Sequence, residues 1–233
     1  MKIGIFSIPE VNPGKRSIKD GRLDEINKFS QAKKKTYLQL DFIGEEALLE
    51  SDMILLKEES RADLILKDLE FVETRLGRAE QDNEKKLLEK LKNILEKEEF
   101  VYKSALTEEE KASISAYGLM TNRPTVFLKK EELEDLDNSL SSALRENGFI
   151  SFFTSNEKES RAWLIKQGIS AWEAAGLIHS DIQKGFIRAE VISFSDLTQA
   201  GGINQAKQAG KMRLEQKEYR VQDADLINFR FNK

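Results

Sequence analysis

Apolar and polar residues follow two rhythms along the chain, one typical of strands and one typical of helices. Short runs of β-forming residues predict strands early in the chain, at Lys2–Phe6, Thr36–Phe42 and Asp52–Leu56. Later runs predict strands at Thr125–Leu128, Phe149–Phe153, Ala162–Ile165, Phe186–Phe194, Tyr219–Val221 and Leu226–Phe231. Helical stretches separate many of these strands, so the pattern indicates a mixed α/β (α+β) fold.

A two-part helical stripe occupies residues 59–99. Its apolar residues recur at steps of three and four, first at Ile65, Leu69, Val72, Leu76 and Ala79, and then at Leu87, Leu88, Leu91, Ile94 and Leu95. This spacing places each set on one face of a helix. A polar turn separates the two stripes, so we predict an inserted antiparallel helical hairpin. We interpret its apolar seam as intramolecular packing, with a partner-docking arm as the alternative.

Capping and turn residues mark the remaining elements. Thr107–Glu110 has the sequence of a capping box and predicts a helix that ends before Pro124. Further helices are expected at Arg22–Phe29, Glu131–Glu146 and Ser170–Leu177, with short pieces within Asp196–Gly210. Pro9, Pro13, Gly14 and Gly21 leave no room for a helix between them, so a loop is predicted after the first strand.

The order of elements changes after residue 148. Two strands, a helix and several strands around a short helix follow, which is the element order of a β-grasp, ubiquitin-like module. We therefore predict two domains that abut closely. Residues 1–148 form an α/β domain with the hairpin inserted at 59–99, and residues 149–233 form the β-grasp domain.

Composition excludes several kinds of chemistry. The 233 residues include no Cys and one His, which excludes disulfides, thiolate zinc sites, a cysteine nucleophile and a His-rich metal cluster. No apolar run approaches the ~20 residues of a membrane span, and the start of the chain does not resemble a signal peptide. We therefore expect a cytoplasmic protein with no membrane partner.

Charge is unevenly distributed. Residues 151–233 hold 12 Lys and Arg against 10 Asp and Glu, a net charge of +2. Residues 1–150 hold 25 against 31, a net charge of −6. The weakly basic charge of residues 151–233, next to the acidic charge of residues 1–150, indicates an anionic partner. The alternative interpretation is that these charges form an ordinary solvated surface.

The last 84 residues contain a dense series of recognisable segments. They are Ile150–Thr154, Glu157–Glu159, Arg161–Trp163, Ala174–Gly176, Ile178–Asp181, Lys184–Glu190, Ala209–Arg213, Val221–Asp225 and Phe229–Asn232. Together they resemble the TGS domain of the YchF-type (Obg-like) P-loop GTPase/ATPase family. Ala224 stands where that family usually has Gly.

The resemblance extends upstream in patches. Asp20–Asp24 resembles the segment after the family's first switch region, and the hairpin lies where the family has its helical arm. Leu40–Gly44 resembles its DxxG motif, which implies that Asp41 and Gly44 descend from a contact to magnesium and to the γ-phosphate. Leu106–Lys111 and Arg123–Thr125 resemble the helix and strand ahead of its base-reading motif.

The residues that hold nucleotide in the family are missing. A P-loop has the sequence G-x-x-x-x-G-K-[ST], in which backbone N–H groups and Lys bind phosphate and the hydroxyl binds magnesium. Here Pro9 replaces the first glycine and Arg16 replaces Ser or Thr. The first switch region is absent, and Lys129–Glu132 lacks the Asn of the base-reading pattern. Asp41 and Gly44 are therefore interpreted as a vestigial strand end and turn.

Charged residues of the last third are the ligand or RNA-binding candidates. They are His179, Asp181, Lys184, Arg188, Lys211 and Arg213. The alternative for His179 is a hydrogen-bonded structural residue, and the alternative for the cations, with Lys217 and Arg220, is ordinary surface. Trp163 and Trp172 are expected to pack in a core or between domains.

These observations predict a shortened, nucleotide-site-deficient member of the YchF-type family. We expect no catalytic residues, no metal site and no cofactor, and a translation-linked binding role toward ribosome, RNA or a protein partner. One alternative is a residual ATP or GTP binder, or slow NTPase, that uses magnesium at Asp41 and Gly44. A second alternative is a homo- or hetero-assembly module that associates through surface exposed by the deletion.

Overall fold

The computed structural model describes residues 1–232, and contacts divide it into two units. The first unit contains Met1–Arg16 and Leu40–Leu136, and the second contains Ser17–Gln39 and the chain from Asp137 onward. The predicted division after residue 148 assigns Ser17–Gln39 to the first domain, whereas its contacts lie in the second unit. A segment near the N-terminus thus forms part of the C-terminal unit.

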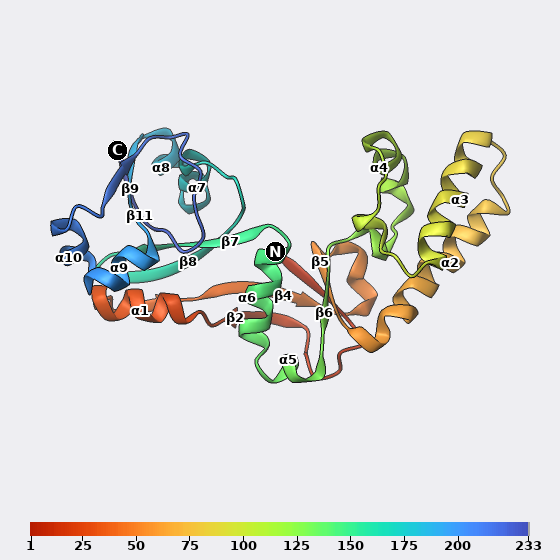
Figure 1. The fold of residues 1–233 in the computed structure, drawn as a ribbon, viewed down its shortest axis with the longest axis horizontal. Helices are drawn as coiled ribbons and strands as arrows, with labels where there is room; N and C mark the ends of the chain where they lie inside the picture. Colours follow the sequence, from red (N-terminus) through yellow and green to blue (C-terminus); the bar gives the residue numbers. More distant parts are fainter. Residues whose placement is uncertain (233) are drawn as a thin grey trace. The chain divides into compact units, whose positions relative to one another are not determined.

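A five-stranded sheet organises the first unit (Figure 1). Its order is β2-β4-β1-β5-β6, with β1 at Lys2–Phe6, β2 at Gly14–Ile18, β4 at Leu38–Ile43, β5 at Met53–Lys57 and β6 at Thr125–Leu128. Strand β1 pairs in parallel with both β4 and β5, and β5 pairs in parallel with β6. The carboxyl ends of these four strands therefore share one edge, where open α/β sheets hold ligands.

Two strand predictions were wrong in detail. Gly14–Ile18 was expected to be loop but forms β2, because the prolines confine the turn to the residues before Gly14, whose φ is 128°. Thr36–Phe42 was expected to be one strand but divides at Tyr37 into β3, Lys34–Thr36, and β4. The two halves belong to different sheets, which local periodicity does not distinguish.

The predicted helical hairpin is present. Helix α2, Arg61–Leu76, packs against α3, Asp82–Glu96 (Figure 1), and the predicted stripe is buried at Val72, Leu88 and Leu91. The other elements of this unit are short: η1 Glu45–Glu50, η2 Glu58–Ser60, η3 Val101–Lys103, α4 Glu108–Ile114, η4 Ser115–Tyr117, η5 Met120–Asn122 and α5 Lys130–Glu134. The predicted capping box at Thr107 opens α4.

The helix predicted at Glu131–Glu146 is interrupted. Asp135 has φ −123° and ψ 60°, outside the helical region, so the stretch forms α5 and α6, Leu136–Glu146. The interruption lies at the border between the two units. Helix α5 belongs to the first unit, whereas α6 belongs to the second unit from Asp137 onward.

A mixed six-stranded sheet organises the second unit, in the order β10-β9-β11-β7-β8-β3. Strands β7, Phe149–Ser155, and β8, Glu159–Lys166, are antiparallel, as are β9, Phe186–Ile192, and β11, Leu226–Phe231. Strand β11 is parallel to β7, and β3 is parallel to β8. The short β10, Arg213–Glu215, was not predicted, whereas the strand predicted at Tyr219–Val221 is only a single bridge from Arg220 to Ser170.

Helices cover both faces of this sheet. Phe152 and Phe153 are neighbours in β7 and point to opposite faces, where they join two separate cores. The Phe152 core includes α7, Ala171–Ile178, which α8, Ser180–Lys184, follows. The Phe153 core includes α9, Phe194–Ala200, α10, Ile203–Gln208, and α1, Gly21–Ser30, whose Leu23 and Ile26 are fully buried.

Candidate functional site

Asp41 and Gly44 lie at the end of β4. Asp41 pairs in register with Lys2 of β1, and its N–H donates to the Met1 carbonyl at 3.1 Å. Gly44 begins η1, and a Cβ built on it would lie 2.5 Å from Oε2 of Glu46. The carboxylate of Glu46 therefore covers the α-carbon of Gly44, which places a negative charge where the family resemblance implies a phosphate contact.

A second carboxylate caps the loop after β1. The N–H of Ser7 donates to Oε1 of Glu45 at 2.9 Å, and Nζ of Lys67 lies 3.7 Å from Oε2 of the same carboxylate. Backbone N–H groups after the first strand are the donors with which a phosphate loop binds its anion. Here one of them is bound to the chain's own carboxylate.

The remaining residues of this segment do not form a phosphate cradle. Pro9 and Pro13 have no N–H to donate. Lys15 and Arg16 lie in strand β2 and are exposed, so the Gly14–Arg16 sequence is part of an extended strand rather than of a loop that precedes a helix. This segment therefore lacks the run of backbone N–H donors that a phosphate loop presents before a helix.

An open cleft of about 510 Å³ lies at the carboxyl ends of β5 and β6. Its lining residues are Glu10, Lys57, Glu58, Glu59, Leu128, Lys129 and Lys130. Nζ of Lys57 lies 2.8 Å from Oε1 of Glu10, and this hydrogen bond lowers the pKa of Glu10. Sequence reasoning examined residues 129–132 only for a missing Asn, and it did not find the cleft.

The candidates from residues 179–188 lie on α8 and the start of β9. His179 caps α8, because its Nδ1 accepts the N–H of Asp181 at 3.1 Å, and both side chains are exposed. Lys184 ends α8 and Arg188 lies in β9, and both are exposed. Arg188 faces Arg230 of β11 in register. The structure thus brings an exposed His and Lys to one short helix, with an exposed Arg four residues beyond it.

Lys211 and Arg213 instead make contacts within the unit. Nζ of Lys211 lies 3.1 Å from Oδ1 of Asp196. Arg213 donates to the Tyr219 hydroxyl at 2.9 Å and lies 3.8 Å from Asp225. The buried Asp225 carboxylate accepts the Tyr219 hydroxyl at 2.7 Å, and burial raises its pKa. These two cations are paired within the fold.

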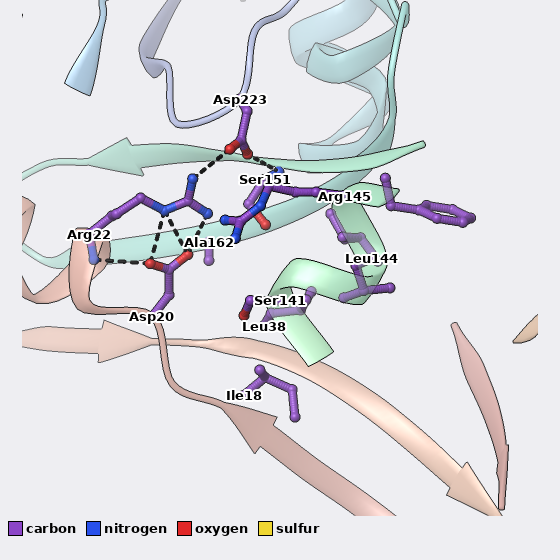
Figure 2. A pocket seen from close by; sticks show the side chains of 12 residues that line it. Ile18, Asp20, Arg22, Leu38, Ser141, Leu144, Arg145, Ser151, Ala162 and Asp223 are labelled. Carbon is purple, nitrogen blue, oxygen red and sulfur yellow. Dashed lines mark hydrogen bonds and ion pairs between the residues drawn. The ribbon is translucent and has the colours of Figure 1, made fainter. Parts of the chain in front are cut away.

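A polar cluster around Arg22 was not predicted. Asp20 caps α1 and accepts the Arg22 N–H at 2.9 Å, while its carboxylate also binds the guanidinium at 2.8 Å (Figure 2). Asp223 binds the other side of the guanidinium at 2.6 Å and accepts the Ser151 N–H at 3.1 Å. Burial opposes the charge of Arg22, but the two carboxylates together raise its pKa.

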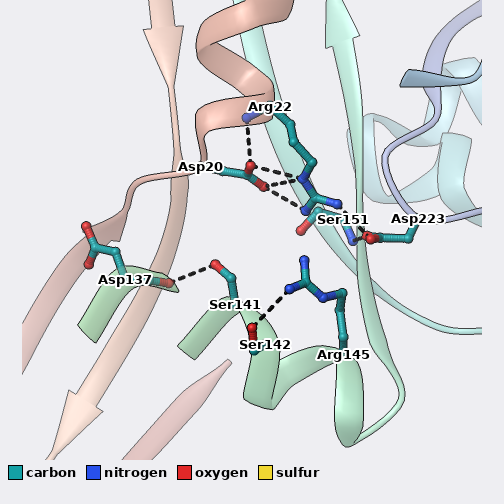
Figure 3. Close-up of polar contacts among 8 residues, drawn as sticks. All are labelled: Asp20, Arg22, Asp137, Ser141, Ser142, Arg145, Ser151 and Asp223. Atoms are coloured by element: carbon teal, nitrogen blue, oxygen red, sulfur yellow. Dashed lines mark hydrogen bonds and ion pairs between the residues drawn. The ribbon is translucent and has the colours of Figure 1, made fainter. Parts of the chain in front are cut away.

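This cluster borders a cavity with room for about one water molecule, roughly 10 Å³. Helix α6 forms part of the wall, where the Arg145 guanidinium donates to Ser142 at 3.0 Å (Figure 3). The cavity is too small for a substrate. Arg22 therefore serves as a structural clamp. The sequence predicted a helix beginning at Arg22 and a family resemblance at Asp20–Asp24, but not this contact.

The two tryptophans differ in burial. Trp163 stacks on Phe152 with ring centroids 6.3 Å apart and donates to Thr154 Oγ1 at 3.0 Å, as the prediction of core packing requires. For Trp172 that prediction was wrong, because its surface is 44% exposed. The side chain lies at the first turn of α7.

Two further properties concern the described residues 1–232. No helix there combines the length and apolar character needed to cross a bilayer. No group of three or more His, Cys, Asp or Glu side chains in that range is placed to hold a metal ion.

These features define a class: a mixed α/β protein with a helical arm and a second, mixed-sheet unit. The fold is that of a solved YchF GTPase from Schizosaccharomyces pombe, with a TM-score of 0.73, 17% identity and coverage of 99% of this chain and 97% of that chain. The family model YchF-GTPase_C, described as a protein of unknown function (DUF933), matches residues 149–232.

Sequence comparison gives the same relationship. The chain is 32% identical over 235 residues to the ribosome-binding ATPase YchF of Bacillus subtilis, a match that covers 73% of this chain. It is also 32% identical over 232 residues to the protein of that name from Haemophilus influenzae. The chain belongs to the YchF family. It spans 64% of the length of both these relatives.

Proposed function

We propose that this protein is a non-catalytic member of the YchF family that binds the ribosome as a regulatory module. The observation that carries the proposal is the Glu45 carboxylate on the Ser7 N–H, in the loop where a nucleotide-binding relative would hold phosphate. An anion there would have to displace a hydrogen-bonded carboxylate, and it would meet the charge of Glu46 beside Gly44.

The arrangement of the second unit supports a β-grasp TGS domain at residues 149–233. Strands β7 and β8 form a hairpin, α7 follows, and β11 returns in parallel beside β7. The resulting order β8-β7-β11-β9-β10 is that of a ubiquitin-like sheet, to which β3 adds an outer strand. In sequence we assign residues 1–148 to a degenerate nucleotide-binding-like domain that carries the hairpin at 59–99, of which Ser17–Gln39 and the chain from Asp137 onward pack in the second unit.

The name of the curated relatives, ribosome-binding ATPase YchF, supports a ribosome partner. We place the contact at the exposed edge formed by His179, Asp181, Lys184 and Arg188. Lys211 and Arg213 would join it only by leaving their carboxylate partners. Contacts from such cations to ribosomal RNA phosphates would weaken as salt is raised. The site of action would be the cytoplasm.

Cosedimentation with ribosomes at about 50 mM and about 300 mM salt tests this proposal. We expect the protein to pellet at low salt and to be released at high salt. The double variant Lys184→Glu with Arg188→Glu should reduce pelleting. A matched control, Lys33→Glu with Lys158→Glu, makes the same change of charge at exposed residues of the same unit and should pellet normally. Absence of pelleting at low salt would refute the ribosome proposal.

A second candidate function is residual ATP or GTP binding, with slow hydrolysis supported by magnesium. The cleft beside Lys57 and Lys129 favours it, because it lies at the sheet edge where such ligands bind. Titration with fluorescent ATP and GTP decides between the two. The non-catalytic proposal predicts no binding by the wild type at millimolar concentration.

A third candidate is an assembly module that pairs with itself or with a longer relative. Exposed apolar side chains at Leu49, Leu66 and Phe71 of the first unit favour it. The molar mass in solution tests this candidate, and a monomer that recruits no partner would exclude it.

A further inference from the structure

A strip of apolar surface crosses three elements of the first unit. Leu49 of η1 is 55% exposed, and a Cβ built on Gly118 would lie 3.5 Å from its Cδ1. Tyr117, which precedes Gly118, packs its ring against Phe71 of α2, with ring centroids 5.9 Å apart. Phe71 is itself 38% exposed. Leu49, Tyr117, Gly118 and Phe71 therefore form one continuous surface, which we call the apolar strip.

An open groove of about 270 Å³ continues the apolar strip at Phe71. It is lined by Phe71, Thr74, Arg75, Arg78, Ala79 and Glu84. Phe71 and Arg75 are four residues apart in α2, so they share one face of that helix. The groove thus places an aromatic ring beside cations.

The Arg75 guanidinium is held in place. Its Cζ lies 4.4 Å from the centroid of the Tyr117 ring, and its Nε donates to Oε1 of Glu84 at 2.8 Å. The Tyr117 hydroxyl donates to the same oxygen at 3.2 Å. The Glu84 carboxylate therefore fixes both side chains, and Arg75 compensates its charge. A surface fixed in this way loses little conformational entropy when a partner binds.

Two further guanidinium groups border the apolar strip. Arg78 is exposed and lines the groove. Arg123 donates to the carbonyls of Leu48 and Leu49, so it lies beside the other end of the strip. The ion pairs found within residues 1–232 include neither of these two arginines. Each arginine therefore retains N–H donors for the carboxylate of a partner.

Two carboxylates of η1 are engaged away from the apolar strip. Glu45 accepts the Ser7 N–H and pairs with Lys67, and Glu50 pairs with Lys2 at 2.7 Å. An incoming segment therefore meets apolar side chains with two guanidinium groups at their borders.

We propose that the apolar strip and its groove bind an acidic, amphipathic segment of a protein partner. The apolar side chains of that segment would cover Leu49 and Phe71, and its carboxylates would pair with Arg78 and Arg123. Aromatic and arginine side chains are enriched among the residues that dominate binding energy at protein interfaces. Charge complementarity selects an acidic segment over a basic one. The inference goes beyond the proposed ribosome contact, because it assigns a second partner to residues outside the edge from His179 to Arg188.

The test begins with a random peptide library displayed on phage, from which the full chain selects binding peptides. The affinity of a selected, fluorescein-labelled peptide is then measured by anisotropy. We expect selected peptides to combine apolar residues with Asp and Glu. Phe71→Ala should weaken binding by about 10- to 30-fold, because it removes an aromatic anchor. Arg78→Glu should weaken it by about 10-fold and reduce its dependence on salt.

Leu66→Ala and Lys97→Glu serve as matched controls. Leu66 is 58% exposed on the same helix as Phe71, and Lys97 is an exposed cation at the end of α3. Neither residue lines the groove. Both variants should bind the peptide within about 2-fold of the wild type, because truncation outside an energetic centre costs little. Circular dichroism verifies that each variant is folded.

Equal affinities for the wild type and a folded Phe71→Ala would overturn the inference. A library that yields no binding peptide, or only peptides without acidic residues, would overturn it as well. A dimer that Phe71→Ala converts to a monomer would assign the strip to a second copy of the chain and also overturn it. Absence of peptide binding with normal ribosome pelleting would overturn the inference and leave the proposed function intact.

Discussion

Nη1 of Arg22 lies 2.6 Å from Oδ2 of Asp223, so an ion pair joins residues 201 positions apart in the sequence. Both side chains are partly buried, and Asp20 binds the other edge of the same guanidinium. The pair attaches the first turn of α1 to the turn before β11. It therefore holds Ser17–Gln39 within the C-terminal unit.

Replacement of Arg22 by Ala should destabilise the protein. The change leaves the carboxylates of Asp20 and Asp223 facing each other without a cation, and we expect the free energy of unfolding to fall by about 2 kcal/mol. Urea denaturation measures the difference. Lys28→Ala, which removes an exposed pair with Glu25 on the same helix, should change it by less than about 0.5 kcal/mol. Equal effects of the two variants would contradict a clamp.

The Leu23 side chain of α1 should behave as a core residue of the C-terminal unit. It is fully buried with Phe153 and Ile192 in the core on one face of the mixed sheet. Leu23→Ala should lower the free energy of unfolding by about 3 kcal/mol, because it leaves a cavity. Tryptophan fluorescence reports this unit, since Trp163 and Trp172 both lie in it. A change within experimental error would show that α1 does not complete the core.

Ala224 adopts a left-handed backbone conformation, with φ 65°. A β-carbon strains this conformation by about 1 kcal/mol or more, and Gly removes the strain. We expect Ala224→Gly to raise the thermal unfolding midpoint. Ala175→Gly, in the middle of α7, should lower it, because Gly costs about 1 kcal/mol in a helix. A lower midpoint for Ala224→Gly would mean that packing of the methyl group outweighs the strain.

Tyr219 should make stability depend on pH in the alkaline range. Burial and the hydrogen bond to Asp225 raise the pKa of Tyr219 above its ordinary value. Stability from the neutral phenol is therefore complete below about pH 10, where the unfolded tyrosine ionises, and is lost as pH rises toward the folded pKa.

Wild type and Tyr219→Phe can be compared by urea denaturation between about pH 8 and about pH 11. We expect the advantage of the wild type to shrink above about pH 10, because Phe does not ionise. A constant difference across this range would show that Tyr219 titrates alike in the folded and unfolded chain.

Much of the fold follows from local sequence. The hairpin of α2 and α3 was predictable because the spacing of Val72, Leu88 and Leu91 defines helix faces without reference to the rest of the chain. The capping box at Thr107 and the hairpin of β7 and β8 were predictable for the same reason. Family resemblance added the relationship to the YchF family, whose C-terminal family model matches residues 149–232.

Tertiary structure decided what depends on partners distant in sequence. No local sequence pattern distinguishes Lys34–Thr36 from Leu38–Ile43 as two strands, yet the first pairs with β8 and the second pairs with β1. The local sequence also does not predict that Trp163 packs in a core while Trp172 is exposed, because burial depends on which elements pack over a side chain. The sequence by itself determined that the motif G-x-x-x-x-G-K-[ST] does not occur among these 233 residues. Only the folded chain placed the Glu45 carboxylate on the Ser7 N–H, because that contact spans 38 residues and requires β1 and η1 to lie together.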